Sequence, residues 1–362
     1  MRKLVTVRKI DNILPIQNAD AIEQLVIDGW NVVAQKGLHS IGDTVVYFEI
    51  DSFLPIEDER FSTFMKFGIS NFEGKQGHRV KTKRLRGVYS QGIVIPVAEF
   101  PEIAEPQADT DYADVIGVVK YEKQEVTGYS GDAKGTFPWF LRKSDQDRIQ
   151  NVYGRLSNYI FGVADKEFVG TLKMDGSSIT VFAVSNDKYY QDDTEGEEVL
   201  GYCSRNQQLK MVEDFEGENW LQNTGKFYQG AYNSDLFNKV SELRKITGKS
   251  LAIQGELVGA GIQGNFEKFE KYQVFAYNIF DVDAGEFVDY KTFLEYAKMV
   301  NLQVVPEVYP AQNILDKSVA DIVQMADGKG LLANYREGVV WKQLNGNVQF
   351  KAISNKYLEK EE

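Results

Sequence analysis

The first hundred residues contain short β-type runs closed by turn signals, and this pattern limits what that part of the chain can fold into. The runs lie at 4–7, 24–27, 31–34, 44–48 and 90–96, with turn residues at 28–29 and 42–43. Several short strands with regular turns are typical of a closed antiparallel barrel rather than a parallel sheet. We therefore predict a small β-barrel here.

The second half alternates strand and helix patterns. Continuous apolar runs predict strands, whereas apolar residues three and four positions apart predict helices. The predicted strands lie at 168–173, 179–184, 201–204, 250–257, 272–280, 338–342 and 348–353, and the predicted helices at 233–247, 290–300 and 314–325. Residues 100–135 are acidic, aperiodic and contain prolines, so we interpret them as linker and loop. We predict an α+β protein with domains at 1–130 and 131–362.

The composition excludes several kinds of chemistry. Cys203 is the only cysteine, so disulfides and thiolate zinc sites are excluded. His39 and His78 are the only histidines, which nearly excludes His-based metal sites and Ser-His-Asp catalysis. Any chemistry must therefore use Lys, Arg, Asp and Glu. No apolar run approaches the ~18 residues of a membrane span, and no signal-peptide core follows the start. We expect a cytoplasmic protein without a membrane partner, or one in the host cytoplasm if a phage encodes it.

The charge balance limits how this chain could bind a polyanion. Lys and Arg total 41 and Asp and Glu total 53, which gives a formal net charge of −12. Proteins that coat nucleic acid are normally basic. A polyanion site on this acidic chain must therefore be a local basic surface, which favours a cleft that concentrates positive charge.

One lysine stands at the end of an apolar strand pattern. Lys173 is followed by Asp175 and Gly176, and then by two serines. An unprotonated lysine amine can attack phosphorus and form a covalent intermediate. Because the ordinary lysine pKa is about 10.4, such chemistry requires neighbouring cations or a metal that displaces the proton. The motif is short, and a surface lysine before a hairpin turn is the alternative interpretation.

Charged residues next to later strands fit the same chemistry. Arg205 follows a strand and its guanidinium is suited to a bidentate phosphate contact. Glu256 places a carboxylate at the end of a buried strand, within reach of a bound ligand. A strand-end salt bridge is the alternative role for this carboxylate. Glu337 precedes an apolar strand and is available to a hydrated metal. Lys351 lies inside the last predicted strand.

Two aromatic residues share one face of a predicted strand. Phe275 and Tyr277 are two positions apart, and a nucleobase could stack on either ring. Phe275 could instead be a core residue, and the sequence leaves both roles open.

These motifs, in this order, resemble those of the covalent nucleotidyltransferase superfamily of ATP-dependent ligases and capping enzymes. The resemblance covers roughly residues 137–360, and the segment 137–151 resembles RNA ligases in particular. A barrel placed before the motifs is similar to the arrangement in RNA ligases with an N-terminal OB domain. The resemblance implies an OB-type barrel followed by an ATP-grasp-like adenylyltransferase domain of two packed antiparallel sheets with flanking helices.

The resemblance also implies a three-step reaction. Lys173 would attack the α-phosphate of ATP and form a lysyl-AMP, the AMP would pass to an RNA 5′-phosphate, and a 3′-hydroxyl would displace it. Lys173, Lys351 and Glu337 would be catalytic, and Mg²⁺ or Mn²⁺ would bind Glu337 and Glu256. The implied ATP-binding residues are Lys173, Asp175, Gly176, Glu256, Tyr277, Phe275, Lys351, Arg148 and Gln150. Arg205 and Lys356 would bind the substrate phosphate.

The chain departs from the family pattern at two points. Many relatives carry a second lysine two positions after the one equivalent to Lys351, but here that residue is Ile353. Either Lys356 or Lys342 would replace it. DNA ligases and capping enzymes also carry an OB module after the last motif, whereas here the barrel pattern comes first.

A basic run in the barrel region is the expected contact for nucleic acid or for the ATP triphosphate. If this segment is extended, Arg79, Lys81 and Lys83 share one face, and Arg84 and Arg86 share the other. A solvated basic face is the alternative interpretation of the same run.

Taken together, the residues and the resemblance predict an ATP-dependent RNA ligase that joins 3′-hydroxyl and 5′-phosphate ends. We expect a monomer that seals nicks in duplex RNA, as in RNA repair. A DNA ligase of the same chemistry, a GTP-dependent capping enzyme and a non-catalytic OB-type RNA-binding protein are the alternatives. The last would leave Lys173, Glu256, Glu337 and Lys351 without a purpose.

Overall fold

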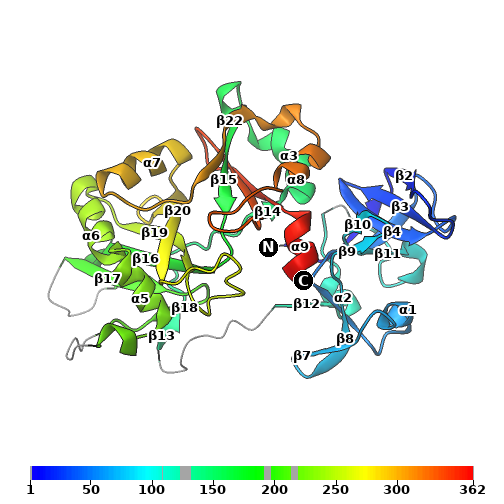
Figure 1. The fold of residues 1–362 in the computed structure, drawn as a ribbon, viewed down its shortest axis with the longest axis horizontal. Helices are drawn as coiled ribbons and strands as arrows, with labels where there is room; N and C mark the ends of the chain where they lie inside the picture. The colour runs from blue at the N-terminus through cyan, green and yellow to red at the C-terminus, as the bar shows by residue number, and fades with distance from the viewer. Residues whose placement is uncertain (1, 108, 123–131, 191–196, 213–218, 362) are drawn as a thin grey trace. The chain divides into compact units, whose positions relative to one another are not determined.

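The computed structural model describes residues 2–107, 109–122, 132–190, 197–212 and 219–361 (Figure 1). The chain divides into two compact units. The first contains Met1–Gln124 with the short stretches Gln150–Gly154 and Leu358–Glu362, and the second contains Glu125–Ile149 and Arg155–Tyr357. The predicted domain limits stay a prediction, although this division also falls between the barrel pattern and the ligase motifs.

The first unit consists mainly of short antiparallel strands. They form the sheets β1-β5-β11, β2-β3-β4 and β12-β6-β8-β7 and the hairpin β9-β10. The strands are β1 (Val5–Lys9), β2 (Asn12–Pro15), β3 (Ile22–Ile27), β4 (Trp30–Gln35), β5 (Thr44–Phe48), β6 (Ser52–Pro55), β7 (Ser70–Phe72), β8 (Lys75–Arg79), β9 (Lys83–Leu85), β10 (Val88–Ser90), β11 (Ile93–Pro96) and β12 (Val119–Lys120). The short helices are η1 (Glu59–Phe61), α1 (Ser62–Met65), η2 (Val97–Glu99) and α2 (Ala113–Ile116).

Alternation along the strands builds the core of this unit. Leu25 and Ile27 of β3 pack with Trp30 and Val32 of β4 in one buried cluster, which also includes Tyr47 of β5. Strands from two of the sheets thus share this core. Residues 113–122 also belong to this unit, because β12 pairs with β6, so the predicted linker is partly structured.

The basic run in the first unit is not one continuous strand, so the two faces expected of an extended segment do not form, and its contact with nucleic acid or ATP stays a prediction. β8 ends at Arg79, β9 begins at Lys83, and Arg86 adopts a left-handed turn conformation with φ 50°. The side chain of Arg79 pairs with Asp51 at 2.7 Å, and Arg84 lies 3.5 Å from Glu359. Pairing with β6 and the tight hairpin therefore decide the direction of each side chain.

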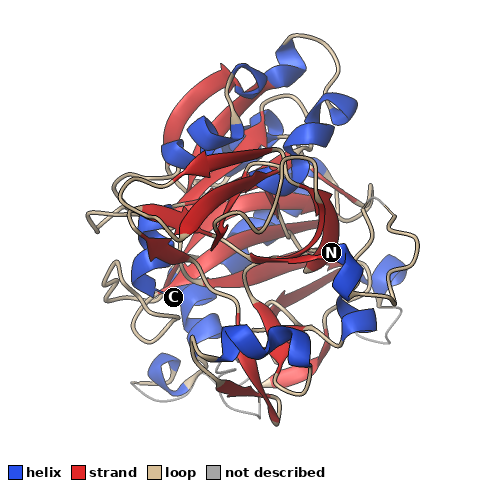
Figure 2. Cartoon of the chain, turned by 90° about the vertical axis from the view of Figure 1, so that its right-hand side faces the viewer, coloured by secondary structure: helices blue, strands red, loops and turns tan. Residues whose placement is uncertain are grey.

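The second unit contains two sheets, which Figure 2 shows among the strands in red. One has seven strands in the order β13-β18-β17-β16-β19-β20-β21, and the other has five in the order β14-β24-β23-β15-β22. All the pairs are antiparallel except β14 with β24. The strands are β13 (Ala133–Thr136), β14 (Asp147–Arg148), β15 (Glu167–Lys173), β16 (Ser177–Ser185), β17 (Glu198–Cys203), β18 (Gln207–Leu209), β19 (Leu251–Val258), β20 (Gln273–Asp281), β21 (Glu286–Phe287), β22 (Glu307–Asn313), β23 (Gly338–Gln343) and β24 (Gln349–Ile353).

Three helices of the second unit cover one face of the seven-stranded sheet (Figure 1). Their buried residues, such as Leu243 and Phe293, pack with Val181 and Ile253 of the sheet. These helices are α5 (Lys226–Asn233), α6 (Leu236–Thr247) and α7 (Tyr290–Met299). The remaining helices are α3 (Ile149–Tyr159), η3 (Ala164–Lys166), α4 (Asn186–Tyr189), η4 (Leu221–Asn223), η5 (Ile314–Asp316), α8 (Val319–Met325) and α9 (Asn355–Glu361).

The opposite face of the seven-stranded sheet packs on the five-stranded sheet. Leu172 and Met174, at the end of β15, share a core cluster with Val258 and Phe275 from β19 and β20. The predicted strands of the second half all correspond to strands of this unit. No helix among the described residues is long and apolar enough to span a membrane.

Two predicted helices are shorter than expected. The helix predicted at 233–247 begins at Leu236, because Asp235 has a left-handed conformation with φ 57° that separates α5 from α6. The helix predicted at 314–325 divides into η5 and α8. Ser318 and Asp321 form a capping box there, which satisfies the first backbone N–H groups of α8.

Candidate functional site

Strand pairing brings Lys173 and Glu337 together. Lys173, the last residue of β15, lies opposite Gly338, the first residue of β23. Glu337 directly precedes that strand, and its Oε1 accepts a hydrogen bond from the Lys173 amine at 2.5 Å. The two residues are 164 positions apart in the chain, so only the antiparallel register makes them neighbours.

The turn after Lys173 packs against Glu256. A side chain on Gly176 would collide with the Leu257 carbonyl and with the side chain of Glu256, so this close approach requires glycine. The backbone N–H of Gly176 donates a hydrogen bond to Glu256. The predicted motif residues Lys173, Asp175, Gly176, Glu256 and Glu337 are therefore brought together at one place.

The carboxylates determine the charge state of this cluster. Burial alone would lower the pKa of Lys173, but Glu337, Glu256 and Asp175 together raise it above its ordinary value. Burial raises the pKa of Glu256 to about 8 against the opposing effect of Lys173, and the charges of Glu337 and Asp175 also raise it. Without further cations the amine is therefore held protonated, which is the form that cannot attack phosphorus.

The same carboxylates fit a hydrated divalent cation. Glu337 Oε2 is buried and accepts no hydrogen bond from the described part of the chain. The described residues contain no group of three His, Cys, Asp or Glu side chains arranged to enclose a metal. Mg²⁺ usually binds through one or two carboxylates and keeps several waters, so Glu337 and Glu256 match its preference.

Tyr277 lies at a β-bulge on the face that carries the site. β20 and β19 pair Asn278 with Gln254 and Ala276 with Gly255, which leaves Tyr277 as the extra residue. Its hydroxyl shares a hydrogen bond with Ser178 at 2.8 Å and accepts one from Ser144 at 3.2 Å. Burial raises the pKa of Tyr277 to about 12, so the hydroxyl stays neutral.

Phe275 has a different environment from Tyr277. Its ring is 6% exposed and packs in the core cluster with Leu172, Met174 and Phe269. The core interpretation that the sequence left open therefore describes Phe275 better, and Tyr277 is the better candidate for a nucleobase contact.

Lys351 and Arg148 lie side by side on neighbouring strands. β14 runs parallel to β24, and this register aligns Arg148 with Lys351. Lys351 also aligns with Val340 on the other side, in the same sheet as Lys173. Gln150 is buried in the first turn of α3 and belongs to the first unit, so its contact with ATP stays a prediction.

Lys342 and Lys356 are the two candidates to replace the lysine that relatives carry at the position of Ile353. The side chain of Lys342 is engaged in other contacts. Its ammonium donates to the Tyr277 carbonyl and, at 3.3 Å, to Asn278 Oδ1. Burial lowers its pKa to about 7. Lys356 is exposed and lies 3.7 Å from Asp327, so Lys356 is the candidate that a phosphate can reach.

Arg205 lies just beyond β17 on the surface of the second unit. Its guanidinium is 3.4 Å from Asp145, and neighbouring Asn206 accepts a hydrogen bond from Lys143 at 2.8 Å. Sequence reasoning assigned no role to Ser144 or Ser178, although both hydroxyls contact Tyr277. Their positions in the sequence could have identified them as site residues, because Ser144 lies in the segment resembling RNA ligases and Ser178 directly follows the lysine motif.

Comparisons with known proteins agree with this architecture. Residues 4–97 match a model of an OB-fold domain and residues 166–358 match the RNA ligase family model. Three solved structures of Naegleria gruberi RNA ligase also match, and each match covers 99% of both chains. The complex with PPi has 35% sequence identity and a TM-score of 0.84. A lysine-to-alanine mutant with ATP and Mn and a glutamate-to-alanine mutant with AMP and Mn each have 34% identity and a TM-score of 0.85. No curated protein sequence matches. The predicted OB-type barrel followed by a sheet-rich catalytic domain is confirmed.

Proposed function

Because the chain belongs to the RNA ligase family, we propose that it joins RNA ends through a lysyl-AMP formed on Lys173. The chain is an ATP-dependent RNA ligase that uses a divalent metal. The observation that carries the covalent step is the position of the Lys173 amine, 2.5 Å from Glu337 and surrounded by Glu256 and Asp175.

The first step forms one bond and breaks another. The unprotonated Lys173 Nζ attacks the α-phosphorus of ATP, the bond between the α-phosphorus and the bridging oxygen breaks, and pyrophosphate leaves. Nζ then loses one proton to solvent, which gives the lysyl-AMP. Glu337 accepts the hydrogen bond from Nζ and orients it. Glu337 and Glu256 would hold a divalent cation, whose positive charge would favour the neutral amine and stabilise the phosphoryl oxygens.

Other residues of the second unit position the nucleotide. Tyr277, held by Ser144 and Ser178, offers its ring to adenine. Lys351 and Arg148 are adjacent cations suited to the phosphates, because charge spreads over the phosphoryl oxygens in the transition state.

The remaining steps transfer AMP and then release it. The RNA 5′-phosphate attacks the lysyl-AMP phosphorus and frees the amine, and the 3′-hydroxyl then attacks the activated 5′-phosphate and expels AMP. Arg205 and Lys356 are the proposed contacts for the 5′-phosphate, since Lys356 is exposed and Arg205 is partly exposed. We propose nicks in duplex RNA as substrates, a monomeric enzyme and a cytoplasmic location. Membership of the RNA ligase family supports an RNA substrate, and the single cysteine, which allows no disulfide within the chain, is consistent with a reducing compartment.

Incubation with labelled ATP and Mg²⁺ or Mn²⁺ tests the covalent step. We expect acid-stable label on Lys173 of the full-length protein and its complete loss in Lys173→Ala. The matched control is Lys166→Ala, which removes a lysine from η3 at the start of the same strand and should leave labelling unchanged. Label that persists in Lys173→Ala, or an unlabelled wild-type protein, contradicts the proposal.

A further inference from the structure

An exposed aromatic ring precedes the ligase motifs, and the proposed reaction does not use it. Trp139 is 80% exposed, although its ring packs on Phe140 and Tyr189 with centroids 5.7 and 6.2 Å apart. Phe140 is itself 9% exposed and lies in the core cluster with Phe182 of β16. The indole is therefore held by one buried and one partly buried ring while most of its surface faces solvent.

Basic residues flank this ring. Residues 133–145 contain three basic residues and one acidic residue, in a chain whose formal net charge is −12. The Lys143 ammonium lies 5.5 Å from the centre of the Phe137 ring, and that of Lys134 lies 5.6 Å from the Tyr190 ring. A flat aromatic surface between cations complements a polynucleotide, which presents stackable bases and negative phosphates.

The same segment leads directly to the nucleotide site. The Arg142 carbonyl accepts a hydrogen bond from Gln254 at 2.7 Å, two positions before Glu256 on β19. Ser144 donates to the Tyr277 hydroxyl, and Asp145 lies 3.4 Å from Arg205. Residues 142–145 therefore lie beside both the proposed adenine ring and the proposed phosphate contact.

The number of residues between Trp139 and Ser144 limits the distance from the exposed indole to the nucleotide site. Ser144 is five residues from Trp139, so the backbone spans at most about 17 Å between them. A polynucleotide strand advances about 3.4 Å per nucleotide when helical. Trp139 thus lies within roughly five nucleotides of a phosphate near the site.

We propose that Trp139, with Lys134 and Lys143, forms a stacking surface for a nucleobase of the RNA strand whose 5′-phosphate binds at Arg205, where fraying of the duplex beside the nick leaves that base unpaired. This inference rests on the proposed function and extends it to the substrate strand. Stacking on a supported indole requires no particular base, because every base has a π-face. The surface therefore contributes affinity without sequence preference.

The test measures binding of a 5′-phosphorylated single-stranded RNA oligonucleotide to the full-length protein. Trp139→Ala should weaken the Kd about 10-fold, and Trp139→Phe should restore most of the binding because it keeps an aromatic face. The rate of lysyl-AMP formation from ATP should stay within about twofold of wild type in both variants. Binding should also quench indole fluorescence in the wild-type protein more than in Trp139→Phe.

Salt dependence separates stacking from phosphate contacts. Each lost phosphate contact reduces the slope of log K against log salt by about one. Lys143→Ala should reduce this slope, whereas Trp139→Ala should weaken binding at every salt concentration with the slope unchanged.

The matched control is Tyr232→Ala, another exposed ring of the same unit. Tyr232 is 47% exposed on α5, which packs on the opposite face of the seven-stranded sheet. A Kd for Trp139→Ala within twofold of wild type, or an equal loss in Tyr232→Ala, overturns the inference. Failure of the proposed function has a different signature, because wild-type protein would then form no lysyl-AMP whatever its affinity for RNA.

Discussion

At the residue scale, two buried lysines of the second unit show how the environment decides chemistry. Lys173 faces Glu337, Glu256 and Asp175, and these negative charges raise its pKa despite burial. Among the described residues, Lys342 donates to two neutral groups, the Tyr277 carbonyl and Asn278, and burial lowers its pKa to about 7. Lys173 therefore stays protonated until cations bind nearby, whereas Lys342 packs between the two sheets.

The environment of Lys342 predicts a pH-dependent effect on stability. Between about pH 7 and 10 the unfolded chain binds a proton at Lys342 that the folded chain does not, so folded-state stability rises with pH there. Lys342→Met removes this contribution. In urea unfolding, the stability of wild type relative to Lys342→Met should therefore rise from pH 7 to pH 10, by at most about 1.4 kcal/mol per pH unit.

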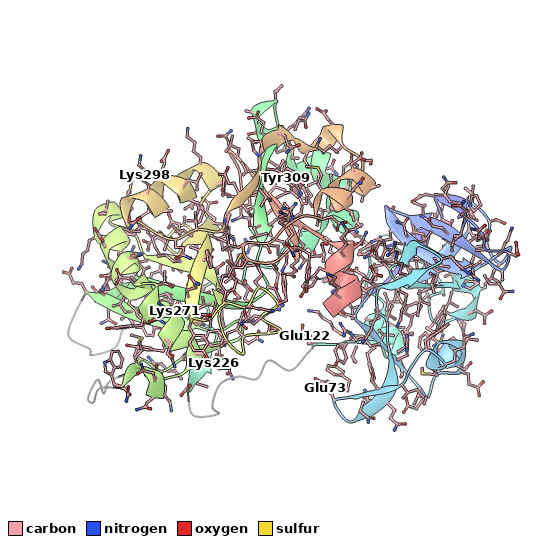
Figure 3. All side chains as sticks on the ribbon, viewed as in Figure 1. Glu73, Glu122, Lys226, Lys271, Lys298 and Tyr309 are labelled. Atoms are coloured by element: carbon pink, nitrogen blue, oxygen red, sulfur yellow. The ribbon has the colours of Figure 1, made fainter. Side chains whose placement is uncertain are left out.

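Lys298→Met is the matched control for that measurement, because Lys298 is exposed on α7 (Figure 3). Its difference from wild type should be independent of pH. A constant difference for Lys342→Met over the same range would show that Lys342 is not the group that titrates.

At the scale of the elements, strand register and one bulge assemble the site. The pairing of β15 with β23 places Lys173 next to Glu337, and the bulge in β20 turns both Tyr277 and Asn278 toward the five-stranded sheet. Bulges are frequent next to active sites because they change the direction of a side chain. The catalytic geometry thus depends on backbone features with little sequence signature.

The substitution Gly338→Ala tests how much the close packing of β15, β23 and β24 contributes to stability and to lysyl-AMP formation. A Cβ at this position would collide with the Ala352 carbonyl of β24, so Gly338→Ala must push the strands apart. We expect a loss of about 1–3 kcal/mol in the free energy of unfolding and a strong reduction in lysyl-AMP formation, because Lys173 pairs directly with this residue. Thermal unfolding and labelling with ATP measure the two effects.

Gly135→Ala provides the comparison, since nothing lies within 4 Å of a Cβ built at Gly135 in β13. It should leave both labelling and the melting temperature close to wild type. Equal behaviour of the two alanine variants would mean that the close approach at Gly338 does not matter.

The elements themselves were largely predictable, because apolar runs and turn residues are local signals. Each predicted strand of the second half overlaps an observed one, and their ends differ by at most three residues. Two features were not predictable from the sequence: the helix interruption at Asp235 and the strand break between Arg79 and Lys83. The first depends on a left-handed residue and the second on a change of pairing partner, and both follow from the surrounding packing.

At the scale of the whole molecule, an OB-type barrel precedes a catalytic domain in one chain of the RNA ligase family. Residues 150–154 of α3 and 358–362 at the chain end belong to the barrel unit, although the neighbouring residues belong to the other. Within the barrel unit, Asn151 donates to the buried Glu49 at 3.0 Å and accepts from Arg8 at 3.0 Å. The barrel is therefore completed by segments from outside its own sequence range.

Exchange of ribose for deoxyribose tests the substrate of the whole enzyme. On nicked duplexes, we expect RNA on both sides of the nick to be sealed at least about 10-fold faster than DNA on both sides, because the 2′-hydroxyl is how proteins distinguish the two. Sealing rates on four duplexes with matched sequences measure this effect. Equal or faster sealing of DNA would instead favour the DNA ligase alternative.

The chemistry was predictable without a structure from the order of motifs between Lys173 and Lys351, from the barrel pattern before them, and from the presence of only two histidines and one cysteine, too few for the other mechanisms considered. These are properties of residue types and spacing along the chain. Only the tertiary structure decided that Phe275 is core, that Lys342 lies beneath Tyr277 and that Arg79 pairs with Asp51. The physical reason is that such neighbours come from different strands, and strand register depends on the packing of the complete domain.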